Sequence, residues 1–384
     1  MDKIYYFDSA ATTRIHDDVF SAMEPYLKDY YGNASSHYSL GNISKNAIDN
    51  AREIIAAGIN CSPDEIYFTS GGSEANNWVI KGFKHRFNVI TTHIVTTNIE
   101  HHSITEALKR RWSNGEDITF TCVPTEKNGV MDPESIANNF KLNTRLCSVQ
   151  MINNELGTIQ PIEAIAAKCY DNNIALHCDA VQALGHIPID VKKMGINLMS
   201  MSGHKCGASK GIGALYISND YKSQIVPFIN GGQQERGMRA STENVAGIVG
   251  FGKAVELSLG RLEENTHNVV ILADILTTEL ERIAGVQINV PLEYTDYRHI
   301  NIRIDGVRSE ELMALLDSQN ICVSAGSACN SDSDQPSHVL KAIGLTDEQA
   351  NSSIRISLSG DNTIEEVEYL VSHLKEDIEI LRDR

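Results

Sequence analysis

The first two-thirds of the chain alternates short β-rich runs with helical segments, and this alternation limits the fold more than any other feature. Strand-like runs are expected at residues 66–69, 93–97, 118–123, 146–152, 175–178, 198–201 and 213–217. Helical segments are expected between most of them, at residues 76–83, 104–112, 133–140 and 161–172. Alternation of this kind predicts an α/β fold with a parallel sheet that carries helices on both faces.

The pattern changes after about residue 253. A long helix is expected over residues 255–284, strands over 286–304, a helix over 309–318 and an amphipathic helix over 363–382. This block predicts a smaller α+β domain that begins near Val255. A chain of 384 residues, 42% of them hydrophobic, is long enough for two domains or more.

The charge and the cysteines exclude several classes of protein. A formal net charge of −17 argues against a general binder of nucleic acid or of anionic membranes. The acidic surface either keeps the protein in solution or faces a basic patch on a protein partner. The eight cysteines include no Cys-x-x-Cys motif and no Cys/His spacing typical of zinc, so no metal site is expected. Because residues 1–7 lack a signal-peptide pattern and no apolar stretch is long enough to span a membrane, we expect a cytoplasmic location.

Small and polar residues follow the strand-like runs, and the first group is Ser70-Gly71-Gly72-Ser73-Glu74. In a parallel α/β sheet, ligands bind beyond the carboxyl ends of the strands. Gly72 lets the backbone approach an anion, the N–H groups of the next helix point at it, and Ser73 adds a hydroxyl. A tight turn with a serine N-cap is the alternative.

Two further groups follow the next strands along the chain. His101 comes after the run 93–97 and can stack on a ring or move protons. Asn154 comes after the run 146–152 and can donate to a ligand oxygen. Loop histidines and turn-forming asparagines are the alternatives.

An aspartate and a lysine complete the series. Asp179 follows the run 175–178, and a carboxylate buried at a strand end needs a cation or a donor, such as a protonated ring nitrogen. A helix cap would explain it equally. Lys205 follows the run 198–201 and can form a Schiff base if desolvation lowers its pKa. Lys210 is the rival, in a stretch that resembles a turn, and either lysine can be a surface residue.

Together these groups match the needs of pyridoxal 5'-phosphate. That cofactor needs an anion cradle, a lysine for its aldehyde and a carboxylate for its pyridine nitrogen. It also benefits from a stacking group and from donors to its phenolate oxygen. The sequence therefore predicts a pyridoxal-phosphate enzyme.

Cys329 lies in a run of small polar residues, which predicts an exposed loop. A thiol there is available as a nucleophile, and an unreactive loop cysteine is the alternative. Arg355 lies on a strand expected over residues 352–357 and can grip the carboxylate of an amino acid bidentately. A surface arginine on an edge strand is the alternative.

From about Ile4 to about Val371, the chain resembles the cysteine desulfurases of the NifS/IscS type, which are class V aminotransferase-like pyridoxal-phosphate enzymes. The stretches that carry the resemblance include Asp8-Ser9-Ala10-Ala11-Thr12-Thr13, Thr69-Ser70-Gly71-Gly72-Ser73-Glu74, Asn153-Asn154-Glu155-Leu156-Gly157, Asp179-Ala180-Val181-Gln182, Ser202-Gly203-His204-Lys205 and Gly326-Ser327-Ala328-Cys329. The resemblance implies an aspartate aminotransferase-like fold. A large cofactor-binding domain is expected over residues 15–255, and a small α+β domain with the Cys329 loop over residues 1–14 and 256–384.

The resemblance also implies a role for each site residue. Lys205 is expected to bind the aldehyde of the cofactor, and Asp179 to pair with its pyridine nitrogen. His101 is expected to stack on the ring and to transfer protons. Gln182 and Asn154 are expected near the phenolate oxygen or the substrate.

The remaining roles concern the phosphate and the sulfur. The expected phosphate ligands are Gly72, Ser73, Ser202, His204 and Thr242. Because Thr242 is expected to reach the phosphate of the other subunit, the resemblance implies a homodimer with shared active sites. Arg355 and Asn154 would hold the carboxylate of L-cysteine. Cys329 would take its sulfur as a persulfide and leave alanine.

The loop around Cys329 resembles the long form of the NifS/IscS branch, which implies transfer of the persulfide to an acceptor protein. The acceptor would serve iron–sulfur cluster, thio-cofactor or tRNA sulfur chemistry. The sequence departs from the family pattern at residues 206–209, where Ser209 replaces a usual proline. Cys206 is expected to be a packing residue, with a second sulfur site as the alternative.

Other functions use the same residues. A selenocysteine lyase or a cysteine sulfinate desulfinase would need Cys329 less, and a plain aminotransferase would need no thiol. A non-catalytic sulfur-transfer scaffold is a further alternative. The presence of Lys205, Asp179, His101 and Cys329 together argues against a scaffold.

Overall fold

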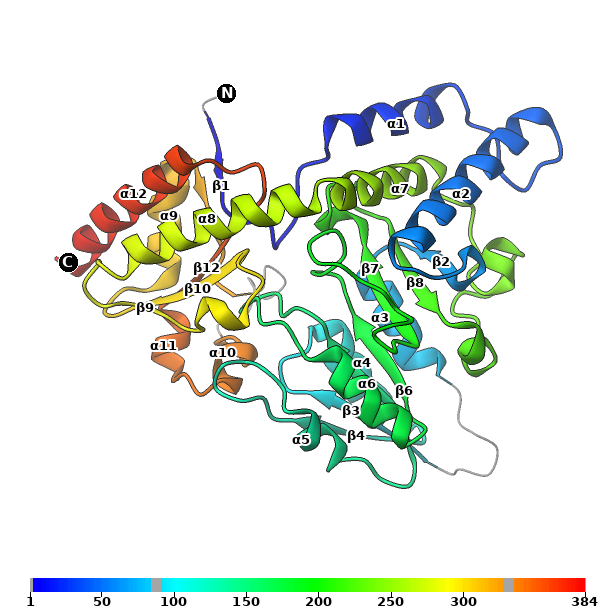
Figure 1. The fold of residues 1–384 in the computed structure, drawn as a ribbon, viewed down its shortest axis with the longest axis horizontal. Coiled ribbons are helices and arrows are strands. Elements are labelled where there is room, and N and C mark those ends of the chain that lie inside the picture. The colour runs from blue at the N-terminus through cyan, green and yellow to red at the C-terminus, as the bar shows by residue number, and fades with distance from the viewer. Residues whose placement is uncertain (1–2, 84–90, 327–334, 384) are drawn as a thin grey trace.

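The computed structural model describes residues 3–83, 91–326 and 335–383. The main sheet of the described chain has seven strands (Figure 1). Their order across the sheet is β2 (Ile66–Thr69), β8 (Gly213–Ile217), β7 (Leu198–Ser202), β6 (Ala175–Asp179), β5 (Thr144–Gln150), β3 (Thr92–Thr97) and β4 (Ile118–Val123).

The strands of the main sheet run parallel except β8, which is antiparallel to both of its neighbours, β7 and β2. A parallel return would need a crossover of a dozen or more residues, usually with a helix. The connection from β7 to β8 contains only the short 3-10 turn Gly203–Lys205, so β8 turns back beside β7. The predicted α/β architecture is confirmed, and this strand is the exception to the expected parallel order.

Helices cover both faces of the main sheet. On one face lie α3 (Gly72–Gly82) and α4 (His102–Ser113), and on the other lie α2 (Ser39–Gly58), α6 (Ile162–Asp171) and α7 (Val245–Gly260). Successive strand residues serve opposite faces because side chains alternate along a strand. On β8, Leu215 packs with α3 and α4, whereas Ala214 packs with the helices of the other face. Two further helices are α1 (Asp17–Lys28), which packs on α7, and α5 (Pro133–Ala137), which packs on α6.

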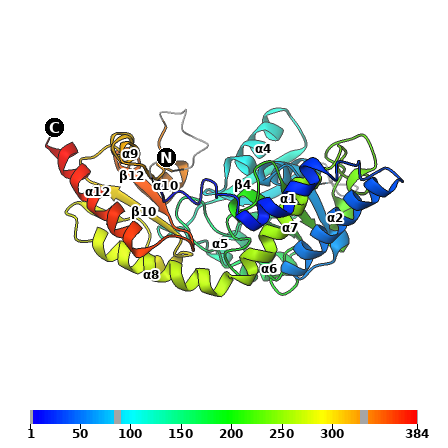
Figure 2. The same cartoon turned by 90° about the horizontal axis from the view of Figure 1, so that it is seen from above.

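A second, smaller sheet has its own hydrophobic core and lies at the left of Figure 1. It contains β12 (Ser353–Ser357), β10 (His299–Ile304) and β9 (Val286–Ile288), which pair antiparallel. Figure 2 shows α8 (Leu262–Leu280) and α12 (Ile364–Arg382) at this end of the molecule, far from α1 and α2. We call this unit, with α9 (Ser309–Ser318), the smaller lobe, and the main sheet with its helices the larger lobe.

The apolar stripe of α12 explains why this helix packs on the smaller sheet. Val367, Leu370, Leu374 and Ile378 recur at helical spacing and are fully buried. Thr363 begins the helix through a capping box with Glu366. Further short elements are β1 (Tyr5–Tyr6), which pairs with β11 (Ile321–Cys322), and the helices α10 (His338–Ala342) and α11 (Asp347–Asn351).

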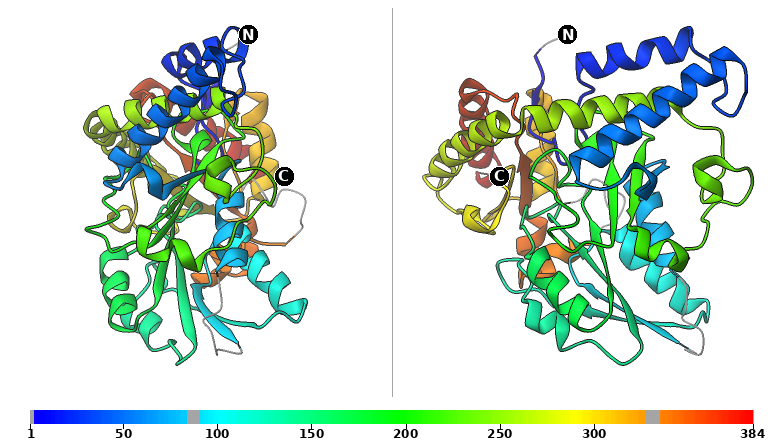
Figure 3. Two further views of the ribbon diagram at one scale, coloured as in Figure 1. Left: turned by 90° about the vertical axis from the view of Figure 1, so that its right-hand side faces the viewer. Right: turned by 45° about the vertical axis from the view of Figure 1, so that its right-hand side comes forward.

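The long helix expected over residues 255–284 is two helices. It breaks at Arg261, where φ is −108°, between α7 and α8. The two helices, yellow-green in the right-hand view of Figure 3, follow one another across the upper part of the molecule below the blue N-terminal helix and link the lobes. The expected domain boundary at Val255 falls inside α7, and Val255 packs in the core of the larger lobe. The division of the chain into domains at this residue stays a prediction.

None of the helices in the described parts of the chain is both long enough and apolar enough to cross a membrane.

Candidate active site

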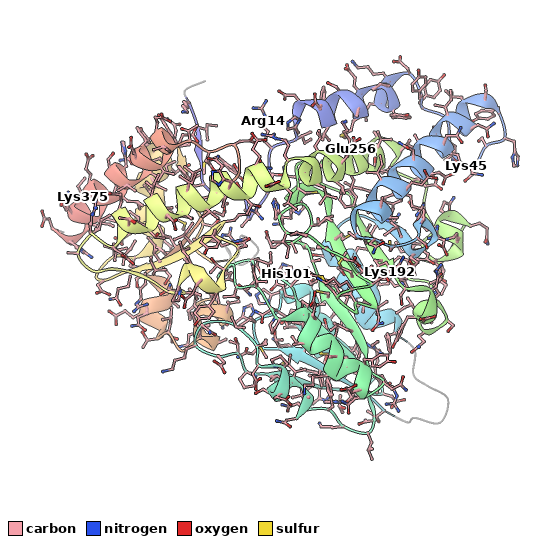
Figure 4. The ribbon with its side chains drawn as sticks, in the orientation of Figure 1. Arg14, Lys45, His101, Lys192, Glu256 and Lys375 are labelled. Atoms are coloured by element: carbon pink, nitrogen blue, oxygen red, sulfur yellow. The ribbon has the colours of Figure 1, made fainter. Side chains whose placement is uncertain are left out.

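The carboxyl ends of β2, β7, β6, β5 and β3 lie on one edge of the main sheet. The predicted site residues at this edge follow these strands: Gly72 and Ser73 after β2, Lys205 after β7, Asp179 at the end of β6, Asn154 after β5 and His101 after β3. In Figure 4 the labelled His101 lies near the middle of the molecule, between the larger and the smaller lobe. The fold therefore brings these side chains, which are far apart in sequence, to one place.

The carboxylate of Asp179 is oriented by two donors. Its Oδ1 accepts the main-chain N–H of Val181 at 3.0 Å, and its Oδ2 accepts the Nδ2 of Asn76 at 2.7 Å. Asn76 lies on α3 and is 1% exposed, and its Nδ2 also donates to Ser103 Oγ at 2.9 Å. Asp179 is thus held at a fixed orientation by a buried amide.

The same chain of hydrogen bonds continues to His101, which caps α4. Its Nδ1 accepts the main-chain N–H of Ser103 at 3.1 Å and lies 2.7 Å from Ser103 Oγ. Because a main-chain N–H can only donate, Nδ1 carries no proton, and the neutral ring carries its proton on Nε2. Burial lowers the pKa of His101, and Asp179 opposes this effect while His102 and Lys205 add to it. The ring is therefore neutral at pH 7, with Nε2 as the proton-bearing atom.

Lys205 ends the short turn after β7. Its Nζ donates to the carbonyl oxygens of Ala10 at 2.5 Å and of Ala11 at 2.7 Å. The Nε2 of Gln182 donates to the same Ala10 oxygen at 2.9 Å. The N-terminal segment thus holds the lysine and the glutamine beside each other. The rival Lys210 is exposed in the turn that follows.

The start of α3 packs closely on the turn after Asp179. A Cβ at Gly72 would lie 2.4 Å from Val181 Cγ2 and 3.6 Å from Ser202 Cβ, so only glycine fits without a shift. Ser202 is buried, whereas Ser73 is exposed on the first turn of the helix. The first N–H groups of a helix have no partner within it, so they are available to an anion.

The remaining two predicted phosphate ligands are His204 and Thr242. The Nδ1 of His204 lies 3.1 Å from Thr12 Oγ1. Burial lowers the pKa of His204 to about 4, so the ring is neutral at pH 7 and can serve only as a hydrogen-bonding group. Thr242 lines a cavity of about 190 Å³ together with Ser70 and Gly211 of the same chain.

Arg355 on β12 comes from the smaller lobe and is 1% exposed, so it is not a surface arginine. Its Nη1 donates to the carbonyl oxygen of Asn154 at 2.7 Å, and its Nη2 pairs with Asp8 Oδ1 at 2.7 Å. The side-chain Oδ1 of Asn154 accepts the Nε2 of Gln150 at 3.1 Å. The guanidinium group therefore lies against the loop that carries Asn154.

The sequence analysis singled out two cysteines, Cys329 and Cys206. Cys329 lies outside the described residues. Cys206 is buried in the core of the larger lobe, its Sγ donates to the Gly203 carbonyl oxygen at 3.3 Å, and burial raises its pKa to about 12. A thiol in that environment is inert, which favours the packing interpretation over a second sulfur site.

Sequence reasoning missed Asn76, Ser103 and the main-chain carbonyl groups of Ala10 and Ala11. The predicted helix began at Asn76, whereas α3 begins one turn earlier, at Gly72. With the earlier start, Asn76 lies inside the helix on a buried face, where a polar residue needs a buried partner. A polar residue on the buried face of a helix was therefore the sequence signal that could have identified Asn76. The carbonyl groups left no signal, because every residue has one.

The comparisons with known proteins agree on one family. A family model described as Aminotransferase class-V matches residues 5–370. The "Cysteine desulfurase IscS" of Methanosarcina thermophila is 42% identical over 382 residues, which cover 100% of this chain and 94% of the relative. A Clostridium botulinum protein of the same name is 43% identical over 386 residues, which cover 100% of this chain and 96% of the relative.

Solved structures give the same result. A "NIFS-LIKE PROTEIN" has a TM-score of 0.91 and 34% identity, and the match covers 98% of this chain and 100% of that one. The structure "SspA in complex with cysteine" has a TM-score of 0.81 and 34% identity, with 93% and 99% covered. The chain therefore belongs to the class-V aminotransferase family and, within it, to the cysteine desulfurases of the NifS/IscS type.

Proposed function

We propose that this protein is a cysteine desulfurase that takes the sulfur of L-cysteine, releases L-alanine and holds the sulfur as a persulfide on Cys329. The observation that carries the proposal is the hydrogen-bonded series Asp179–Asn76–Ser103–His101. It orients a carboxylate and a neutral imidazole at the edge of the sheet where Lys205 lies. Family membership and a structural relative named as a complex with cysteine support the substrate.

The residues of the site fit pyridoxal 5'-phosphate. Gln182 Oε1 and Asn76 Oδ1 are buried and have no hydrogen-bond partner among the described residues, which leaves polar atoms for a ligand. Asp179 is suited to a protonated ring nitrogen, Lys205 to an aldehyde and the first turn of α3 to a phosphate. When bound, the cofactor supplies an electron sink that stabilises negative charge on the substrate.

Each of the other site residues has a role in holding this cofactor. His101 would stack on the ring, and Gln182 would bind the phenolate oxygen. Gly72, Ser73, Ser202 and His204, with Thr242 from the other subunit, would hold the phosphate. The neutral state of His204 fits a hydrogen bond to phosphate rather than an ion pair.

Arg355 and Asn154 hold the carboxylate of L-cysteine. The Nη1 of Arg355 donates one N–H to Asn154, and the Nη2 donates one N–H to Asp8. Each of these nitrogens has a second N–H that can bind a carboxylate. A guanidinium group binds a carboxylate best through two such parallel bonds. The fixed guanidinium therefore orients the amino acid before the reaction.

The reaction needs two kinds of step from the protein. Lys205 Nζ and His101 Nε2 move protons at the substrate. The Cys329 thiolate attacks the sulfur of L-cysteine and forms a sulfur–sulfur bond. The carbon–sulfur bond breaks with its electron pair left on Cβ, which takes a proton and becomes the methyl group of alanine. The persulfide then passes to an acceptor protein.

The working unit is a homodimer. Large apolar side chains of α1 and α2 are exposed in the single chain: Phe20, Leu27 and Ile43, with Tyr31 and Tyr38 close by. An apolar surface of this kind supports contact with a second copy. The net charge of −17 supports an acceptor protein with a basic surface.

The test is release of alanine from L-cysteine by the wild type and by Cys329→Ala, with a thiol reductant present. We expect wild type to produce alanine and sulfide, and the variant to keep its cofactor colour but to lose activity. Equal release by both proteins, or release by neither, would show that Cys329 is not the nucleophile and would favour a lyase that acts on another substrate, such as selenocysteine or cysteine sulfinate, or a scaffold. A protein that stays colourless with added cofactor would indicate a scaffold.

A further inference from the structure

A short segment near the N-terminus, residues 8–11, contacts both Arg355 and Lys205. We call it the N-terminal strap. In Figure 1 it lies in the blue segment between β1 and α1, which passes from the smaller to the larger lobe. Arg355, the proposed carboxylate-binding residue, lies in the smaller lobe, and Lys205, the proposed partner of the cofactor aldehyde, lies in the larger lobe. No side chain of the strap takes part in the proposed reaction.

The strap begins on β12 of the smaller lobe. Asp8 Oδ1 pairs with Arg355 Nη2 at 2.7 Å, and the two side chains are 15% and 1% exposed. The main chain is held to the same strand, because the N–H of Ala10 donates to Ser357 Oγ at 3.0 Å and the N–H of Ser357 donates to the Phe7 carbonyl oxygen at 2.7 Å. A charged group that is removed from water needs a partner of opposite charge. Asp8 therefore neutralises the buried guanidinium group and fixes its direction.

The strap reaches Lys205 of the larger lobe only two residues later. The carbonyl oxygens of Ala10 and Ala11 accept hydrogen bonds from Lys205 Nζ at 2.5 Å and 2.7 Å. The Cα atoms of Asp8 and Ala10 can lie at most about 7 Å apart, because an extended chain spans about 3.3–3.6 Å per residue. The strap therefore ties the position of the Arg355 guanidinium group to that of the Lys205 side chain.

We infer that Asp8 is a positioning residue that makes the site selective for α-amino acids, because it fixes Arg355 to the strap that also contacts Lys205. The inference rests on the proposed function, in which Arg355 binds the carboxylate and Lys205 marks the place where the amino group binds. In an α-amino acid these two groups share one carbon atom, whereas in a β-amino acid a further carbon separates them. Two binding groups held at a fixed separation favour the ligand whose own groups match that separation.

The acceptor oxygen of Asp8 is the property that orients Arg355. Asparagine keeps an acceptor oxygen at the same position but carries no charge. The charge of Asp8 also repels the carboxylate of a ligand at the same guanidinium group, so removal of this charge alone does not weaken the binding of that ligand. Alanine removes the acceptor and leaves the guanidinium group free to turn. Asp8→Asn should therefore keep the selectivity that Asp8→Ala removes.

The experiment is an equilibrium titration of the holoenzyme with L-alanine, β-alanine and ethylamine, followed by the absorbance of the cofactor. L-Alanine and β-alanine are isomers that differ in the spacing of their two charged groups, and ethylamine is alanine without its carboxyl group. We expect wild type to bind L-alanine about tenfold or more tightly than β-alanine, because only L-alanine places its carboxylate on the guanidinium group. Asp8→Ala should reduce this preference to about threefold or less. The affinity for ethylamine should stay within about threefold of wild type in each variant, because ethylamine makes no contact that depends on Arg355.

Asp17→Ala is the matched control, because Asp17 is also paired with an arginine, Arg14, but both side chains are exposed. It should leave all three affinities unchanged. A preference that survives in Asp8→Ala overturns the inference, as does an equal loss of affinity for all three ligands or the same loss in the control. Loss of the preference in Asp8→Asn overturns it as well. If Asp8→Ala does not fold, Asp8→Glu decides, because it keeps the charge but moves the acceptor by one methylene group, and an unchanged preference in Asp8→Glu overturns the inference.

The wild type separates this inference from the proposed function. If it releases alanine from L-cysteine but does not prefer L-alanine to β-alanine, the inference alone is overturned. If it releases no alanine from L-cysteine, the proposed function is overturned, and this inference with it.

Discussion

Asn76 donates a hydrogen bond of 2.7 Å to the carboxylate of Asp179, and both side chains are almost completely buried. The same amide nitrogen binds Ser103 at 2.9 Å, so one side chain of α3 connects the end of β6 with the start of α4. Asp179 and His101 are 78 residues apart in sequence (179 minus 101). Their relative orientation therefore depends on a residue of a third element.

The first prediction concerns this amide. Asn76→Ala leaves Asp179 with one donor fewer, and an unpaired buried acceptor costs about 1–3 kcal/mol. We expect this loss in the free energy of unfolding and a roughly tenfold weaker affinity for pyridoxal phosphate. Unfolding in urea and a cofactor titration measure the two effects. Asn77→Ala is the control, because Asn77 bonds to the Ser73 and Ser103 carbonyl oxygens and not to Asp179. Equal weakening of cofactor binding by the two variants would contradict the prediction.

The second prediction concerns Glu100, whose pKa burial raises to about 8. Its Oε1 accepts Thr97 Oγ1 at 2.6 Å and the main-chain N–H of Gln150 at 3.0 Å. Because the folded state binds the proton more tightly than the unfolded state, Glu100 contributes stability at low pH that is lost as the pH rises from about 4.5 to about 8. The slope is at most about 1.4 kcal/mol per pH unit.

Glu100→Gln keeps both acceptor contacts but does not titrate. Urea unfolding at pH values from 5 to 8 should therefore show a flatter fall in the free energy of unfolding than in wild type. Glu106→Gln is the control, because Glu106 is an exposed residue that pairs with Lys109 on the same helix, α4. A slope that is the same in wild type and in Glu100→Gln would show that the carboxyl group is not responsible.

The third prediction compares two glycines with the same backbone conformation. Gly157 has φ +73° and Gly115 has φ +74°, but a Cβ at Gly157 would lie 2.6 Å from His299 Cβ, whereas a Cβ at Gly115 meets nothing within 4 Å. Gly115→Ala should cost about 1–2 kcal/mol for the left-handed conformation alone. Gly157→Ala should cost about 1–3 kcal/mol more for overpacking. Thermal unfolding of the two variants checks the difference, and equal losses would exclude the contact with His299.

The fourth prediction concerns Cys206. With a pKa of about 12 and a buried Sγ, this thiol should resist iodoacetamide in the native protein at pH 8, while the exposed Cys122 reacts faster. Cys206→Ala should keep the yield of persulfide within about twofold of wild type. Mass spectrometry after alkylation measures both outcomes. Rapid modification of native Cys206, or a large loss of persulfide without it, would favour a second sulfur site.

Much of the local structure follows from the sequence. The strand over residues 66–69 and the helix over residues 309–318 lie where the pattern predicts them. Both depend on side-chain periodicity and on turn residues at their ends, which are local properties. The polar groups expected after the strands do lie on one edge of the sheet, because parallel strands end on the same side.

Other features depend on contacts that no local pattern contains. The reversal of β8 depends on the length of its connection, and the break at Arg261 depends on the packing of α7 and α8 in two different cores. The role of Asn76 depends on the start of α3 at Gly72, because this start places Asn76 inside the helix on a buried face.

The sequence by itself determined the α/β class, the order of the polar groups along the chain and the family. Only the tertiary structure decided which hydrogen-bond partner each group has: the Asn76 amide for Asp179, the Ala10 carbonyl oxygen for Lys205 and the Asp8 carboxylate for Arg355. Asp8 and Arg355 are 347 residues apart. The physical reason is that hydrogen bonds and ion pairs act over a few ångströms in space, so their partners are set by the folded chain and not by its order.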